Sequence, residues 1–126
     1  MIRALVVVLV LAAAVAVPAG AAPAKTIGTV ASVDYRVVVT AERSSGGSAP
    51  SARVDATAYR WSHGHWHRLE SRRLAGPFFW KVVSAPHAVC ELAIATSGGG
   101  AKPQARVQLL VSPSIGCGRA YRIGLA

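Results

Sequence analysis

Apolar residues occupy alternate positions over most of the chain beyond residue 32, and they do not recur there every three to four residues. A period of two places apolar side chains on one face of a β-strand, whereas an amphipathic helix requires the longer period. The first such segment has apolar residues at Val33, Tyr35, Val37 and Val39. The pattern therefore predicts a mostly β protein whose strands bury one face.

Gly, Pro and Ser interrupt this pattern at short intervals, as expected where a chain turns between short strands. Ser62, His63 and Gly64 separate two segments that resemble a hairpin, and the Ser- and Gly-rich stretch 42–51 is expected to be a flexible loop. About seven strands are expected, over residues 33–40, 52–61, 65–74, 78–83, 90–94, 107–111 and 117–125. An all-β fold follows, namely a small immunoglobulin-like β-sandwich.

The N-terminus has the layout of a secretory signal peptide, in which a cation precedes an apolar run and small residues follow it. Arg3 precedes the uncharged run 4–17, and a small-residue cleavage site ends at Ala21. A second site of the same kind ends at Ala24. We therefore expect a signal peptide over residues 1–21, or to 24 if the second site is used, and a secreted, extracellular mature protein.

The alternative is an uncleaved membrane anchor, because residues 4–24 are nearly as long as the ~20 apolar residues that span a bilayer. Two prolines and a glycine within this segment oppose a continuous helix. With cleavage, residues 22–32 form an N-terminal extension and 33–126 a single domain, since a chain of this length buries one core. No contact with the membrane is expected after cleavage.

The chain contains two cysteines, Cys90 and Cys117. In an oxidising compartment an even pair of cysteines in a small domain normally forms a disulfide. Closing a loop of about 27 residues in this way would stabilise the fold by ~3–4 kcal/mol in the chain-entropy model. We therefore expect a disulfide between them.

The mature chain is basic. Export removes Arg3 and leaves 13 of the 14 Lys and Arg residues against 5 Asp and Glu, a net charge of +8. Most of these cations are arginines, which bind planar anions through two parallel hydrogen bonds. Such a surface favours a cell-wall polysaccharide, an anionic surface or another extracellular protein as partner. An arginine-rich surface that is merely solvated is the alternative, and no nucleic acid is expected for an exported chain.

Catalytic signatures are absent from the sequence. The five carboxylates have no spacing that indicates a facing pair, and there is no zinc-protease, nucleophile-elbow or phosphate-loop motif. His87 and Cys90 could act as a histidine–cysteine dyad only if Cys117 were not the partner of Cys90. We therefore expect a protein that is not an enzyme and that binds no cofactor.

The hairpin segment 59–68 concentrates histidine and tryptophan. Three imidazoles at alternate positions of a strand can bind zinc or copper, and the three here are His63, His65 and His67. If Gly64 lies in the turn, however, only His65 and His67 share a face, and the coordination shell is incomplete. Solvated histidines at a hairpin tip are the alternative.

Either two-residue turn, His63–Gly64 or Gly64–His65, sorts the neighbouring side chains in the same way. One face is expected to carry Tyr59, Trp61, Trp66 and Arg68, together with Asp55, Thr57, Glu70 and Arg72. The opposite face, expected to adjoin the core, carries Val54, Ala56, Ala58 and Leu69. Exposed aromatics on a polar face form a platform for sugars or proteins. Alternatively, they cover the end of the sandwich against Phe78, Phe79 or Trp80, or they fill the core with the faces exchanged.

These observations predict a secreted, monomeric, non-catalytic binding module. Its expected binding residues are Tyr59, Trp61, Trp66 and Arg68. One alternative is an extracellular metal-binding protein that uses the three clustered histidines. Another is a small secreted protein inhibitor or effector, although the loop 42–51 is too rich in Gly and Ser to present a rigid inhibitory segment unless it is held in place. No motif points to a particular family.

Overall fold

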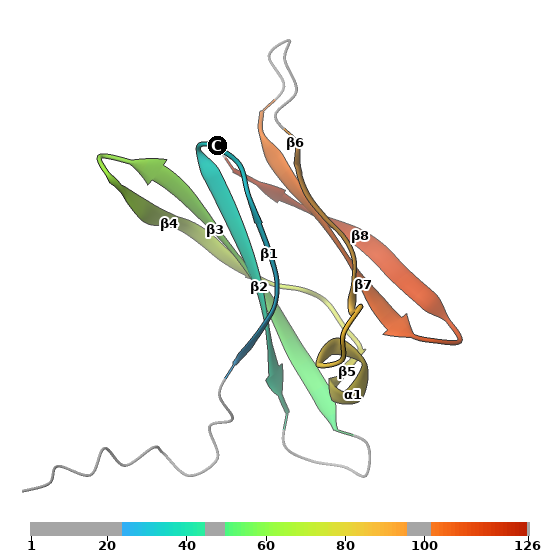
Figure 1. Ribbon diagram of the computed structural model, residues 1–126. Coiled ribbons are helices and arrows are strands. Elements are labelled where there is room, and N and C mark those ends of the chain that lie inside the picture. Colours follow the sequence, from blue (N-terminus) through green and yellow to red (C-terminus); the bar gives the residue numbers. More distant parts are fainter. Residues whose placement is uncertain (1–23, 45–49, 96–101, 126) are drawn as a thin grey trace, which may run out of the picture.

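The computed structural model describes residues 24–44, 50–95 and 102–125, which form eight strands and one short helix (Figure 1). The elements are β1 Lys25–Ala31, β2 Tyr35–Arg43, β3 Ser51–Ser62, β4 His65–Arg73, β5 Phe78–Phe79, α1 Trp80–Val83, β6 Val89–Ala95, β7 Gln104–Ser112 and β8 Gly116–Gly124. The expected signal peptide lies outside the described residues. Among those that are described, no helix has the length and apolar character needed to cross a membrane.

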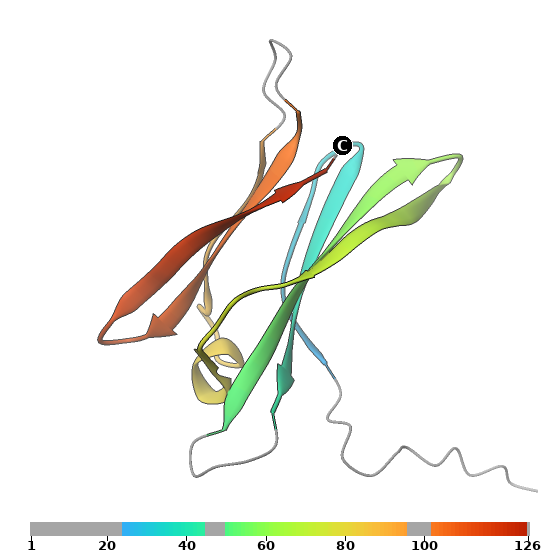
Figure 2. The ribbon, with the colours of Figure 1, turned by 180° about the vertical axis from the view of Figure 1, so that it is seen from behind.

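The strands form two antiparallel sheets that lie one over the other (Figures 1 and 2). The larger sheet has the order β1-β2-β3-β4, with β5 paired to the start of β3, and the smaller sheet has the order β6-β7-β8. The expectation of an all-β, two-layered fold is confirmed. Apart from the short β5, neighbouring strands are consecutive along the chain in both sheets, whereas in an immunoglobulin sandwich the chain crosses repeatedly between the sheets.

The core fills the space between the two sheets. Alternate residues of β2 and β3 face it and pair across the strands, Val37 with Ala58 and Val39 with Ala56. The smaller sheet contributes the facing apolar residues Ala105, Val107, Leu109 and Ile123. The period of two predicted for 33–40 therefore holds from Tyr35 onward, while Val33 is 89% exposed in the bend before β2.

Strand β1 lies within the segment 22–32, which was expected to be an extension, and pairs with β2 along its length. A register shift between Thr26 and Gly28 breaks the alternation of its side chains, so the sequence lacks the period of two there. β1 also packs against β6. A Cβ atom at Gly28 would lie 3.1 Å from side-chain carbons of Val89 and Leu92, so a glycine permits the close approach of the two strands.

The prediction of one strand over residues 78–83 is wrong for its second half. Only Phe78–Phe79 pair with β3, and Trp80–Val83 form a single helical turn. This turn buries Val83 completely in the core, and the Ser84 hydroxyl donates a hydrogen bond to the Trp80 carbonyl at its end. Burial of Val83 thus outweighs the β propensity of these aromatic and β-branched residues.

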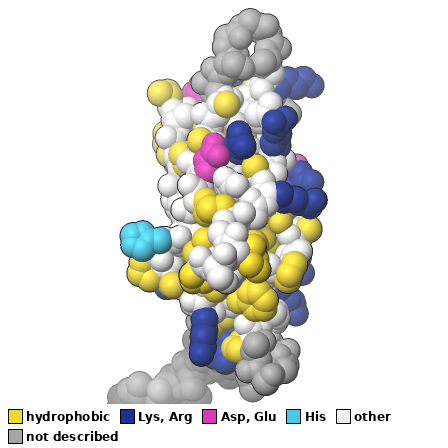
Figure 3. All heavy atoms as spheres, turned by 90° about the vertical axis from the view of Figure 1, so that its right-hand side faces the viewer, with side chains coloured by type: hydrophobic (Ala, Val, Ile, Leu, Met, Phe, Trp, Pro, Cys, Tyr) yellow, Lys and Arg dark blue, Asp and Glu magenta, His cyan; other side chains and the backbone are white. Residues whose placement is uncertain are grey.

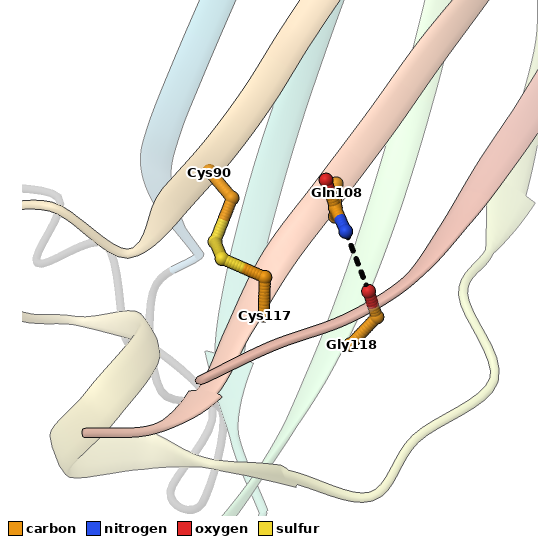
Figure 4. Close-up of a disulfide and its surroundings, with 4 residues drawn as sticks. All are labelled: Cys90, Gln108, Cys117 and Gly118. Carbon is orange, nitrogen blue, oxygen red and sulfur yellow. Dashed lines mark hydrogen bonds between the residues drawn. A yellow bond between two sulfur atoms is a disulfide. The ribbon is translucent and has the colours of Figure 1, made fainter. Parts of the chain in front are cut away.

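Cys90 in β6 and Cys117 in β8 form the expected disulfide, with Cα atoms 6.3 Å apart (Figure 4). The bond joins the starts of the two strands that flank β7. Beside it, the Gln108 side-chain amide of β7 donates a 2.8 Å hydrogen bond to the Gly118 carbonyl of β8 (Figure 4). Both cysteines are exposed to solvent, so the disulfide cross-links the sheet without filling the core.

Candidate functional site

The β3–β4 hairpin extends away from the smaller sheet, and its tip is free of the core (Figures 1 and 2). Ser62 and His65 form the last pair, so His63 and Gly64 make the turn. Both turn residues have positive φ, 53° and 82°, as a two-residue type I′ turn requires. The structure therefore adopts the first of the two turns that are consistent with the sequence.

The turn fixes how the aromatic residues, which were predicted to share one face, pair across the hairpin. Tyr59 lies opposite Arg68 and Trp61 lies opposite Trp66. The two indole rings meet edge to face, with centroids 5.3 Å apart. The backbone N–H of Trp61 also donates a 2.7 Å hydrogen bond to the Asp34 carbonyl, which ties the hairpin to the bend before β2.

A β-bulge changes the pairing on the other side of Tyr59. The register shifts between Ala58 and Tyr59, so Ala58 faces Glu70 and Leu69 has no partner. Glu70 and Arg72 therefore share the side of Ala58 and Ala56, and the prediction that they lie on the aromatic face is wrong. Leu69, which was expected on the core side, is 41% exposed and lines a hollow with Gly124 and Leu125.

The aromatic face points away from the core. Val54, Ala56 and Ala58 are fully buried, as predicted, so the two faces of β3 are not exchanged. Trp61 is 43% exposed, Tyr59 and Trp66 are half-buried, and Arg68 is exposed. We call Tyr59, Trp61, Trp66 and Arg68 the tip platform.

The platform does not cover the end of the sandwich. Phe78 and Phe79 pair with Ala52 and Ser51, at the opposite end of β3 from Trp61. About ten residues of extended strand, roughly 30 Å at ~3.3 Å per residue, separate these positions. The large aromatics of β5 therefore cannot bury the tip platform.

Arg36 belongs to the same face, although the sequence pattern did not indicate it. The register between β2 and β3 pairs Arg36 with Tyr59, which is itself paired with Arg68. Tyr59 thus has an arginine opposite it on each neighbouring strand, since directly opposite residues on one face have Cβ atoms about 5 Å apart. The Arg36 Nε atom is buried and has no hydrogen-bond partner among the described residues.

The three histidines lie at the same tip, and two of their imidazoles are close together. His65 and His67 have ring centroids 4.1 Å apart, and His67 Nε2 lies 3.0 Å from the Ser62 carbonyl oxygen. Within the described ranges, no group of three or more His, Cys, Asp or Glu side chains is arranged to hold an ion. The structure therefore brings two imidazoles together and leaves His63 in the turn.

Comparison of the chain with protein-family models, with curated proteins and with solved structures finds no match. The fold and the residues of the tip are therefore the basis on which function is inferred.

Proposed function

We propose that this protein is a secreted, monomeric, non-catalytic module that binds an anionic cell-wall polysaccharide through the tip platform, without a cofactor. The observation that carries the proposal is the cross-strand row Arg36, Tyr59 and Arg68 beside the Trp61–Trp66 pair on the solvent side of a projecting hairpin. Export by a cleaved signal peptide is part of the same proposal.

The residue types suit such a ligand. The apolar faces of sugar rings pack against aromatic side chains, which offer large contact areas at little cost in conformational entropy. Guanidinium groups bind carboxylates and phosphates through paired, charge-assisted hydrogen bonds. Exposed aromatic side chains with arginines beside them thus suit a polymer that has both sugar rings and acidic groups. Such a polymer can bind on the surface without being deeply buried.

If the signal peptide is cleaved as proposed, the first residue of the mature chain can be predicted. Protein recovered from the culture medium of a secreting host should begin at Ala22 or Lys25 and contain no free thiol. Intact-mass measurement with and without a thiol-alkylating reagent checks both points. Recovery of a chain that retains residues 1–21, or alkylation of both cysteines without a reductant, would contradict the export proposal.

The Arg68→Ala variant tests the charged part of the platform. Exposed ion pairs contribute ~0.2–1 kcal/mol, so Arg68→Ala should weaken binding of polygalacturonate, a uronic-acid polysaccharide, by up to about fivefold at low salt. The difference from wild type should shrink in 1 M NaCl, where charge interactions are screened within ~3 Å. Affinity electrophoresis at both salt concentrations measures this.

Arg53→Ala is the matched control, because Arg53 is an exposed arginine near the opposite end of β3. It removes the same charge and should retain wild-type affinity. Equal losses in both variants would show attraction by net charge alone and would count against the tip as the binding site.

A further inference from the structure

A hollow of about 430 Å³ lies where residues 75–78, which lead from β4 into β5, pass close to β7 and β8. We call it the β5 hollow. Seen from the side of the smaller sheet, hydrophobic side chains gather over the lower half of the molecule, and Lys and Arg side chains follow its right-hand edge (Figure 3). Small-molecule sites in proteins have volumes of roughly 300–1,000 Å³, so the β5 hollow suits a small molecule.

Apolar and aromatic side chains form most of the lining of the β5 hollow. Phe78 and Leu109 belong to the core cluster, and Val111 and Tyr121 are half-buried beside them. The rings of Phe78 and Tyr121 have centroids 6.5 Å apart and are tilted by 52°. The Tyr121 hydroxyl donates a hydrogen bond to the Ala75 carbonyl, so this ring reaches from β8 to the segment before β5. A flat aromatic ligand can pack against such rings edge to face or with an offset.

The only charged residue that lines the β5 hollow is Arg119. Its guanidinium carbon lies 5.1 Å from the centroid of the Tyr121 ring, within cation–π range. Both ion pairs found within residues 24–44, 50–95 and 102–125 lie elsewhere, so no carboxylate of these ranges pairs with Arg119. A carboxylate bound in the hollow would therefore meet a cation that is not already neutralised, and a guanidinium can donate two parallel hydrogen bonds to it.

We propose that the β5 hollow binds a small aromatic carboxylic acid, whose ring packs beside Phe78 and Tyr121 and whose carboxylate accepts hydrogen bonds from the Arg119 guanidinium. The site is separate from the tip platform, because Phe78 pairs with Ala52 at the end of β3 opposite Trp61. It does not rest on the binding of a polysaccharide. Failure of one proposal therefore leaves the other standing.

Titration of the full mature protein with cinnamate, followed by two-dimensional amide NMR, tests the site. The amide signals of Gly76, Phe78 and Gly118, which line the hollow, should shift and saturate together. Cinnamamide has the same ring without the charge. Because exposed ion pairs contribute little, it should bind up to about fivefold more weakly than cinnamate at low salt. The signals locate the ligand without any substitution.

Arg119→Gln removes the charge and leaves the apolar lining in place. It should weaken cinnamate binding, measured at the Gly118 signal, by up to about fivefold and leave cinnamamide binding unchanged. A merely structural effect would weaken both. Arg119 is exposed, so the variant should melt as the wild type does.

Arg122→Gln is the matched control, because Arg122 lies in the same strand but pairs with Arg106 on the outward face of the smaller sheet. It should bind both probes as the wild type does. The proposal is wrong if cinnamate shifts only signals near Gly64 at the hairpin tip or none at all, if cinnamamide binds as tightly as cinnamate, or if Arg122→Gln loses as much affinity as Arg119→Gln.

Discussion

Replacing Trp61 or Trp66 with alanine is expected to weaken polygalacturonate binding by ~2 kcal/mol, roughly 30-fold, and to leave thermal unfolding nearly unchanged. Aromatic residues that a partner desolvates dominate binding energies. Trp61 is 43% exposed in the free protein, so its truncation opens no cavity in the core. Calorimetric titration and thermal melting of the same preparations measure the two effects.

Trp80→Ala is expected to have the opposite effects, on stability and not on binding. Trp80 starts α1 and packs, half-buried, against the core cluster. Its truncation should lower the melting temperature without changing the affinity of the folded protein, because large-to-small changes remove buried contacts. If Trp61→Ala or Trp66→Ala instead lowered the melting temperature as Trp80→Ala does, the tip aromatics would be structural and the proposed binding site would be wrong.

Removing the disulfide should lower the free energy of unfolding substantially and leave the packing of the core unchanged. The double variant Cys90→Ala/Cys117→Ala opens a cross-link between residues 27 apart. The chain-entropy model predicts a loss of about 3.5 kcal/mol in the free energy of unfolding. Both cysteines are exposed, so their replacement creates no cavity, and the change reports the cross-link alone. Urea denaturation of the variant and the oxidised wild type measures it.

Wild-type protein reduced with dithiothreitol is the matched control, since it loses the same bond and keeps both side chains. It should unfold at a urea concentration close to that of the double variant. An unchanged midpoint in the double variant would show that the disulfide does not stabilise this fold.

Much of the local structure follows from the sequence. The period of two in Val37 and Val39 defines the buried face of β2, and the positive φ that Gly64 permits places the hairpin turn. Both turns that the sequence allows put Tyr59, Trp61, Trp66 and Arg68 on one face, so this sorting was predictable. The pairs Tyr59–Arg68 and Trp61–Trp66 follow only from the turn that the structure adopts. Each of these features depends on residues close together in the chain.

Features that depend on distant contacts were not predictable. The bulge beside Tyr59 sends Arg72 toward β8, where it bonds the Arg122 carbonyl 50 residues away. Likewise, burial of Val83 against both sheets favours a helical turn over a strand. No local pattern encodes either contact, because each is stabilised by a surface that exists only once the two sheets have packed.

The candidate site shows the same division. The hairpin alone predicts four of its residues, but Arg36 joins them only through the register between β2 and β3. The sequence between those strands is rich in Ser and Gly, and such a sequence specifies register weakly. Once Val37 is known to pair with Ala58, the next pair along the two strands is Arg36 with Tyr59. The sequence does not reveal the first pair, so it does not place Arg36 beside Tyr59.

The most direct test of the tip platform is a fluorescence titration of Trp80→Phe with polygalacturonate. The chain has three tryptophans, so this variant emits only from Trp61 and Trp66. We predict that its emission shifts to shorter wavelength as the polymer desolvates the two indoles, and that it saturates with the affinity measured by calorimetry. Unchanged emission at polymer concentrations that saturate the calorimetric signal would show that the polymer binds elsewhere and would contradict the account.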